Sequence, residues 1–147
     1  MSTVNLEHTS EDARTFRTAG SGGTLWAGRC LSALAILFLA LDALGKLLEV
    51  APVRAGTAQL GYPESVVPAL GVILSLCVVA YAIPRTSVLG AVLLTGYLGG
   101  AVAAQARVGN PLVSHTLFPV YVGVLVWGGL FLREARLRGL LPWRSGR

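Results

Sequence analysis

Ionisable side chains in the first long apolar segment are the residues of this sequence best placed to do chemistry. Asp42, Lys46 and Glu49 stand at positions i, i+4 and i+7, so a helix carries them on one face. Charges here are informative, because Asp or Lys at the centre of a membrane helix costs about 3 kcal/mol. We predict Asp42 and Lys46 as catalytic residues that bind a polar headgroup or move protons, and Glu49 as a substrate-binding residue.

Polar residues at the ends of the three later apolar segments are predicted to join this group. Tyr97 and Arg107, with Gln105 nearby, fall within one narrow arc of the third segment. Glu64 precedes the second segment, and these four residues are predicted to bind the substrate. His115 opens the fourth segment and is a third catalytic candidate, because imidazole carries protons near neutral pH.

A structural interpretation accounts for the same residues without a site. Asp42 would pair with Lys46 or with Arg107 across the bundle. Glu64 would cap the second helix at its N-terminus, where the helix dipole favours an anion, and His115 would be an interfacial residue. Metal binding is not predicted, because the other histidine of the sequence lies in the N-terminal tail.

The composition places these residues in a membrane protein. Of 147 residues, 54% are hydrophobic and 13% are charged, against about 25% charged residues in soluble domains. A helix that crosses the hydrocarbon core needs about 20 residues, so the chain has room for four spans and short loops but not for a second domain. We predict an all-α integral membrane four-helix bundle, multi-pass in the cell membrane.

Apolar runs and turn signals set the boundaries of the predicted elements. A disordered tail is predicted over 1–23, because its composition is polar and mixed in charge, and an Arg-rich tail over 134–147. Between them lies a membrane domain over 24–133. Its four spans are predicted at about 24–50, 65–83, 87–106 and 115–132, with glycine and proline marking the turns.

Small residues recur in the last two spans. Gly96, Gly100 and Ala104 are spaced every fourth residue, with Gly99 and Ala103 beside them, and Gly123, Gly128 and Gly129 follow in the fourth span. We predict that these residues allow close packing of the helices, as small-xxx-small stripes do in membrane proteins.

The basic residues predict an orientation. Nine of the 12 lie in the two tails, at Arg29 or in the turn at 84–86, and three (Lys46, Arg54 and Arg107) lie toward the other side. Lys and Arg accumulate in cytoplasmic loops, so both termini are predicted to be cytoplasmic, with the polar cluster at the opposite end. Basic residues form no stripe with interleaved aromatics, so nucleic acid is not a predicted partner.

Several segments carry a family resemblance: Asp42-Ala-Leu-Gly-Lys46, Leu60-Gly-Tyr-Pro63, the run from Gly90 to Arg107, and His115-Thr-Leu-Phe-Pro119 leading to Leu137-Arg138 and Pro142. Over about residues 25–142 the chain resembles the DoxX-like family of small four-span membrane proteins. The resemblance implies a four-helix membrane bundle with a quinone or redox association. Relatives often have Thr-His where this chain has Ala104-Gln105, which puts a two-histidine mechanism in doubt.

Two functions follow from these observations. The first is an accessory or quinone-interacting subunit of a membrane oxidoreductase. No flavin, haem or iron–sulfur motif is present, so no cofactor is expected to be built in, quinone is the expected ligand, and electrons would come from a redox partner protein. The alternative is a stand-alone isomerase or cyclase that acts on a lipophilic small molecule by acid–base chemistry.

Two further classes are disfavoured. Cys30 and Cys77 form no CxxC pair, which argues against a thiol–disulfide enzyme. A transporter usually shows inverted repeats and interrupted spans, and the sequence shows neither, although a homo-oligomer could supply a pathway.

Overall fold

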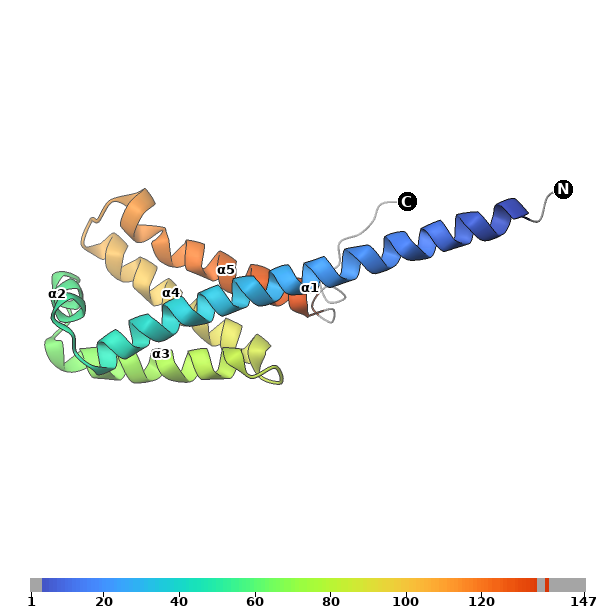
Figure 1. The fold of residues 1–147 in the computed structure, drawn as a ribbon. Helices are drawn as coiled ribbons and strands as arrows, with labels where there is room; N and C mark the ends of the chain where they lie inside the picture. Colours follow the sequence, from blue (N-terminus) through green and yellow to red (C-terminus); the bar gives the residue numbers. More distant parts are fainter. Residues whose placement is uncertain (1–3, 135–136, 138–147) are drawn as a thin grey trace.

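The structure, a computed structural model, describes residues 4–134 and 137, with side chains from residue 22 onward. The described chain is helical, and its elements follow one another with short connections (Figure 1). They are α1 (Val4–Leu47), α2 (Ala51–Gln59), the 3-10 turn η1 (Glu64–Val66), α3 (Val67–Ala82), α4 (Ser87–Arg107), the π turn η2 (Leu112–Thr116) and α5 (Phe118–Arg133).

Four of these helical segments are long and apolar enough to cross a membrane. They run over Gly22–Leu47, Glu64–Ala82, Ser87–Arg107 and Leu112–Arg133. Their ends lie within about three residues of the predicted spans, so the predicted four-span membrane architecture is confirmed. The chain is a multi-pass membrane protein in contact with the lipid bilayer.

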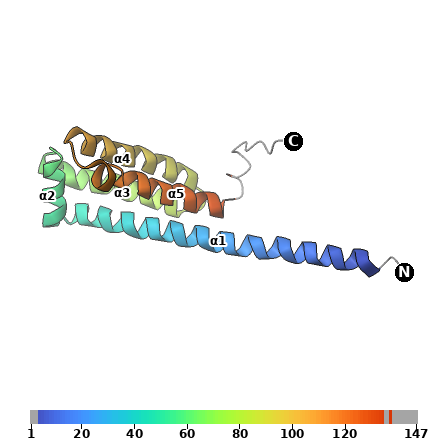
Figure 2. The same cartoon turned by 90° about the horizontal axis from the view of Figure 1, so that it is seen from above.

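The spanning helices form a four-sided bundle around one apolar core. α1 packs against α3 and α5, and α4 packs against the same two helices, which places α1 and α4 on a diagonal. Each helix contributes a fully buried or nearly fully buried leucine to the core: Leu39, Leu74, Leu94 and Leu130. α1 continues well past the other helices toward the N-terminus in both views (Figures 1 and 2).

Two segments differ from the predicted secondary structure. α1 begins at Val4, so residues 4–23 are helical where a disordered tail was predicted. Adding residues to an existing helix needs no new nucleus, so the helix of the first span can extend toward the N-terminus. Residues 51–59 form α2 instead of an irregular connection, with Pro52 in the first turn, where proline is favourable. The predicted C-terminal tail lies almost entirely outside the described residues.

The bundle end that holds the last turn of α5 is closed by polar side chains with internal partners. The buried Tyr81 hydroxyl donates to the carbonyl of Val126 at 2.8 Å and lies 3.0 Å from Ser32 Oγ. Arg133 donates to the Tyr81 carbonyl at 3.2 Å, and its guanidinium lies 5.0 Å from the centre of the Tyr81 ring. We call this group, Ser32, Tyr81 and Arg133, the closed end.

Glycines allow the helices to touch at the closed end. A Cβ at Gly90 would lie 2.2 Å from the backbone nitrogen of Tyr81, and one at Gly129 would lie 2.6 Å from Ser32 Oγ. Both distances are shorter than any real contact of a side chain. Here glycine is required by close approach of α4 to α3 and of α5 to α1.

Candidate functional site

A cavity of about 490 Å³ occupies the opposite end of the bundle, which we call the open end. Its lining comes from the last turns of α1, from α2, from the start of α3, from the second half of α4 and from the start of α5. The volume lies within the range of about 300–1,000 Å³ typical of small-molecule sites. Most of the lining is apolar, so the few polar groups in it determine what it can bind.

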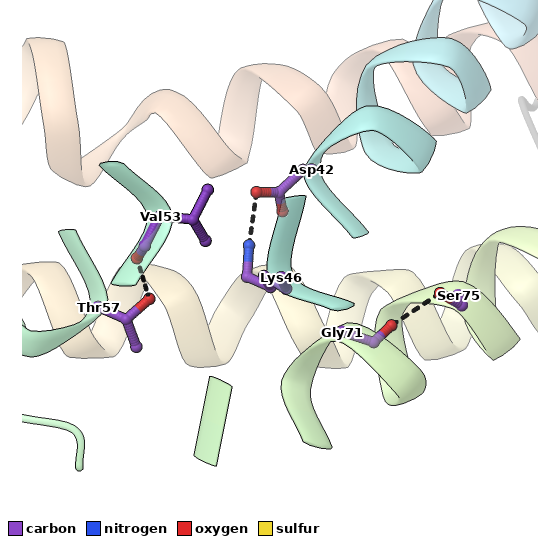
Figure 3. Close-up of polar contacts among 6 residues, drawn as sticks. All are labelled: Asp42, Lys46, Val53, Thr57, Gly71 and Ser75. Atoms are coloured by element: carbon purple, nitrogen blue, oxygen red, sulfur yellow. Dashed lines mark hydrogen bonds and ion pairs between the residues drawn. The ribbon is translucent and has the colours of Figure 1, made fainter. Parts of the chain in front are cut away.

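The polar feature of this cavity is the ion pair of Asp42 and Lys46. Lys46 Nζ donates to Asp42 Oδ1 at 2.5 Å, one helical turn along α1 (Figure 3). The Lys46 side chain is 13% exposed and that of Asp42 is 35% exposed, so the lysine side chain is the more buried of the two. The pairing lowers the cost of both charges in an apolar setting and leaves ammonium N–H groups to bind a ligand.

Short helix α2 lies across the end of the cavity and supplies part of its wall. Val53 and Thr57 of α2 lie beside Lys46 in Figure 3, and both line the cavity. The Thr57 hydroxyl is buried and donates to the Val53 carbonyl at 2.8 Å, so it is satisfied within its own helix. Sequence reasoning missed these residues because the segment was expected to be an irregular connection, although Pro52 was an available signal for a helix start.

The small residues of α4 line the cavity instead of packing against a helix. Gly96, Gly100 and Ala104 are all in its wall. A Cβ at Gly96, Gly99, Gly100 or Gly128 would meet nothing within 4 Å. The prediction of close packing is therefore wrong for these four glycines. Gly96 and Gly100 meet nothing because they face the cavity, whereas Gly99 and Gly128 do not line it.

Two further predicted binding residues, Tyr97 and Gln105, also line the cavity. Tyr97 is half-buried on α4. Gln105 accepts a hydrogen bond on its side-chain oxygen from the amide of Asn110, just past the end of the helix. Of the predicted site residues, the cavity brings together Asp42, Lys46, Tyr97 and Gln105, from two helices.

Arg107 supports the cavity without lining it. It is exposed, and its guanidinium donates to the Leu60 carbonyl at 2.6 Å and lies 5.9 Å from the centre of the Tyr62 ring. Leu60 and Tyr62 do line the cavity. Between them Gly61 has a φ of +77°, and a Cβ there would lie 3.0 Å from the Arg107 side chain. Arg107 holds the Leu60–Tyr62 segment in place, and it does not pair with Asp42.

Glu49 and Glu64 lie outside the cavity lining. Glu49 is exposed at the C-terminus of α1 and has a φ of +49°. Glu64 is exposed and forms an ion pair with Arg54 of α2, which raises the pKa of Arg54 above its ordinary value. The first turn after Pro63 has no side-chain cap hydrogen bond, but Glu64 is the acidic residue of that turn, at the helix N-terminus where the dipole favours an anion. Both residues were predicted to bind the substrate, but neither lines the cavity together with Tyr97 and Gln105.

His115 is also placed away from the cavity lining. Its side chain is exposed, and Nδ1 lies 2.8 Å from Ser114 Oγ. The residue belongs to the π turn η2, in which the Leu117 amide bonds to the Leu112 carbonyl at 2.8 Å. A regular helix start was expected at this position, and the structure has a π turn there instead. The catalytic role of His115 stays a prediction.

Among the described residues, no three His, Cys, Asp or Glu side chains are grouped so that they could hold a metal ion.

Comparison with known proteins gives a family. The model of the DoxX-like family matches residues 30–129, which is more than half of the chain. The matched range contains the Asp42–Lys46 ion pair, α2 and the α4 wall of the cavity. No similar protein was found among curated sequences, and no similar fold among solved structures. The four-span bundle and the matched range together show that this chain belongs to the DoxX-like family.

Proposed function

We propose that this protein binds the head group of a quinone in the cavity at the open end, as an accessory subunit of a membrane redox system. The observation that carries the proposal is the ion pair of Asp42 and Lys46 in the wall of an otherwise apolar cavity. A membrane carboxylate and ammonium are costly and are kept where they have a task. A planar ring with carbonyl oxygens matches this combination of apolar wall and local charge.

The donor set fits such a head group. Lys46 has three N–H donors and uses one of them on Asp42. The remaining donors and the Tyr97 hydroxyl can bind carbonyl oxygens, while Leu39, Leu98 and Val122 offer apolar contact to a ring. A bound quinone supplies reversible uptake of electrons and protons. Asp42 and Lys46 would orient the head group and hold or pass a proton at the Lys46 ammonium and the Asp42 carboxylate.

The orientation of the chain is part of this proposal. Both termini are placed in the cytoplasm because most of the basic residues lie at the closed end and in the tails. The cavity then opens toward the non-cytoplasmic side of the membrane. Reporter fusions at each terminus test this: activity of a cytoplasm-dependent reporter at both ends supports it, and activity at one end alone contradicts it.

A binding experiment tests the proposed function. Purified protein in lipid nanodiscs is titrated with a decyl-substituted benzoquinone, and the dissociation constant is measured for the parent protein, Lys46→Met and Asp42→Asn. Each hydrogen bond to a charged group contributes about 1.5–3 kcal/mol, so Lys46→Met should weaken binding at least about tenfold. The redox partner is sought separately, by cross-linking in native membranes.

A matched control separates the ion pair of the cavity from charge in general. Arg54→Gln removes one partner of an exposed ion pair at the same end of the bundle without touching the cavity lining. We expect this variant to bind like the parent protein. Failure of the parent protein to bind, or equal affinities of Lys46→Met and Arg54→Gln, would contradict the proposal. The alternative is an isomerase or cyclase that uses the Asp42 carboxylate in acid–base chemistry. Conversion of the bound molecule without a redox partner would support that alternative.

A further inference from the structure

A second hollow lies between α4 and α5, on the outer side of the cavity wall. We call it the α4–α5 groove. It has a volume of about 310 Å³ and is lined by Leu98 and Gly99 of α4 and by Pro119, Gly123 and Trp127 of α5, among other residues. The Thr95 hydroxyl in it accepts from the indole nitrogen of Trp127 at 2.8 Å, so the groove presents an apolar surface. Val120 and Val124 at its rim are 43% and 65% exposed, so the groove faces outward.

The cavity and the α4–α5 groove share part of one wall. Leu98 and Pro119 line both of them. Leu98 is 8% exposed and Pro119 is buried, so these two side chains form the partition between the polar head-group site and the outer face of the bundle.

The neighbouring side of the cavity, between α1 and α5, is closed by aromatic rings. Phe38 and Phe118 both line the cavity, and their rings meet edge to face with centroids 5.5 Å apart. On the α4–α5 side the wall consists of the Leu98 and Pro119 side chains, and among the described residues no pair of aromatic rings meets there. A Cβ at Gly99 would meet nothing within 4 Å, and one at Gly123 would meet Leu98 Cδ1 at 3.8 Å.

We propose that the α4–α5 groove holds the apolar chain of the molecule whose head group occupies the cavity, with the chain passing between Leu98 and Pro119. The inference rests on the proposed function and narrows the ligand class to membrane lipids with a compact carbonyl head and one long apolar chain. The groove follows α4 over residues 95–102, about 10 Å along the helix axis. A molecule bound in this way keeps its chain at the lipid face while its head reaches Asp42 and Lys46.

The test uses two ligands that differ only in the chain. In nanodiscs we would measure the dissociation constants of a benzoquinone without a chain and of its decyl derivative, each expressed as concentration in the bilayer. Lipid is as apolar as the groove, so the chain itself adds little affinity. The expected effect is steric: Gly123→Leu, which fills the groove, should weaken binding of the decyl compound at least about tenfold. The compound without a chain should bind within about twofold of its affinity for the parent protein.

Two further variants make the test decisive. Gly99→Leu fills the groove from α4, and should act like Gly123→Leu if that variant is poorly folded. Gly128→Leu is the matched control, because Gly128 also has open space at its Cβ position but lines neither hollow. We expect it to bind both compounds normally.

The outcomes separate this inference from the proposed function. If the parent protein binds both compounds and the groove variants lose neither or both equally, the groove assignment is overturned and head-group binding stands. If the parent protein binds neither compound, both proposals fail. Selective loss of the decyl compound supports both.

Discussion

The α4 glycines at the open end of this bundle have different surroundings from the glycines at the closed end. At the closed end, glycines bring backbones into contact, as at Gly90 against Tyr81 and at Gly129 against Ser32. At the open end, a Cβ at Gly96 or Gly100 would meet nothing within 4 Å, and both glycines border a cavity of about 490 Å³. A glycine stripe in a membrane helix can therefore either allow close approach of a second helix or border a cavity. Which of the two occurs depends on the position of the neighbouring helix.

The polar groups of the two ends also differ in what they bond to. The Tyr81 hydroxyl and the Arg133 guanidinium bond to backbone carbonyls across the helices, which ties α3 to α5. Lys46 and Asp42 bond to each other on one helix and face the cavity. The first arrangement stabilises the fold, whereas the second leaves bonding capacity for a ligand. This difference leads to predictions for both ends.

The largest expected effect is at Gly90. In Gly90→Ala the new methyl group would overlap the backbone of Tyr81, which cannot move as a flexible side chain can. We expect the free energy of unfolding to fall by at least about 3 kcal/mol, at the upper end of what overpacking costs. Reversible unfolding in mixed micelles measures it. Gly100→Ala at the open end is the control and should change stability by less than about 1 kcal/mol. Equal losses of unfolding free energy in Gly90→Ala and Gly100→Ala would contradict the difference in glycine packing between the two ends.

A smaller effect is expected from Tyr81→Phe. This change deletes the buried hydroxyl that bonds to the Val126 carbonyl and lies beside Ser32, at the cost of about 1–2 kcal/mol in the free energy of unfolding. Tyr121→Phe provides the comparison, because its exposed hydroxyl is 3.5 Å from the Val113 carbonyl. The same unfolding titration should show almost no change for Tyr121→Phe. No loss for Tyr81→Phe, or an equal loss in both variants, would contradict a special contribution of the buried hydroxyl at the closed end.

The order and length of the spans could be predicted from the sequence, because hydropathy and turn residues report them directly. Pairing of Asp42 with Lys46 was one of two open alternatives, and helical spacing made it geometrically available. The role of the α4 glycines could not be predicted. In helices that are apolar on every side, periodicity does not show which face meets a neighbour. Arg107 was also unpredictable, because its partner is a backbone carbonyl, at Leu60, which carries no sequence signal.

A third prediction concerns helix termini at the open end. α1, α2 and α4 each end with a left-handed residue followed by an amide that bonds back to a carbonyl five residues earlier, as Val50 does to Gly45. Gly61 and Gly109 occupy this position in α2 and α4, but α1 has Glu49 with a φ of +49°. A side chain costs about 1 kcal/mol there.

Glu49→Gly should therefore raise the free energy of unfolding by up to about 1 kcal/mol, while Gly109→Ala should lower it by a similar amount. Both are measured in the same micelle titration. Since Glu49 does not line the cavity, quinone affinity should be unchanged in Glu49→Gly. A loss of affinity would indicate that Glu49 contributes to ligand binding, as the sequence predicted.

The most direct test of the difference between the ends is native mass spectrometry of the protein released from membranes without detergent exchange. The account predicts a bound lipophilic carbonyl compound on the parent protein and on Arg54→Gln, and its loss from Lys46→Met and from Gly100→Phe, which fills the cavity. Retention of the same compound by Lys46→Met and Gly100→Phe, or its absence from the parent protein, would contradict the assignment of the open end as a ligand site.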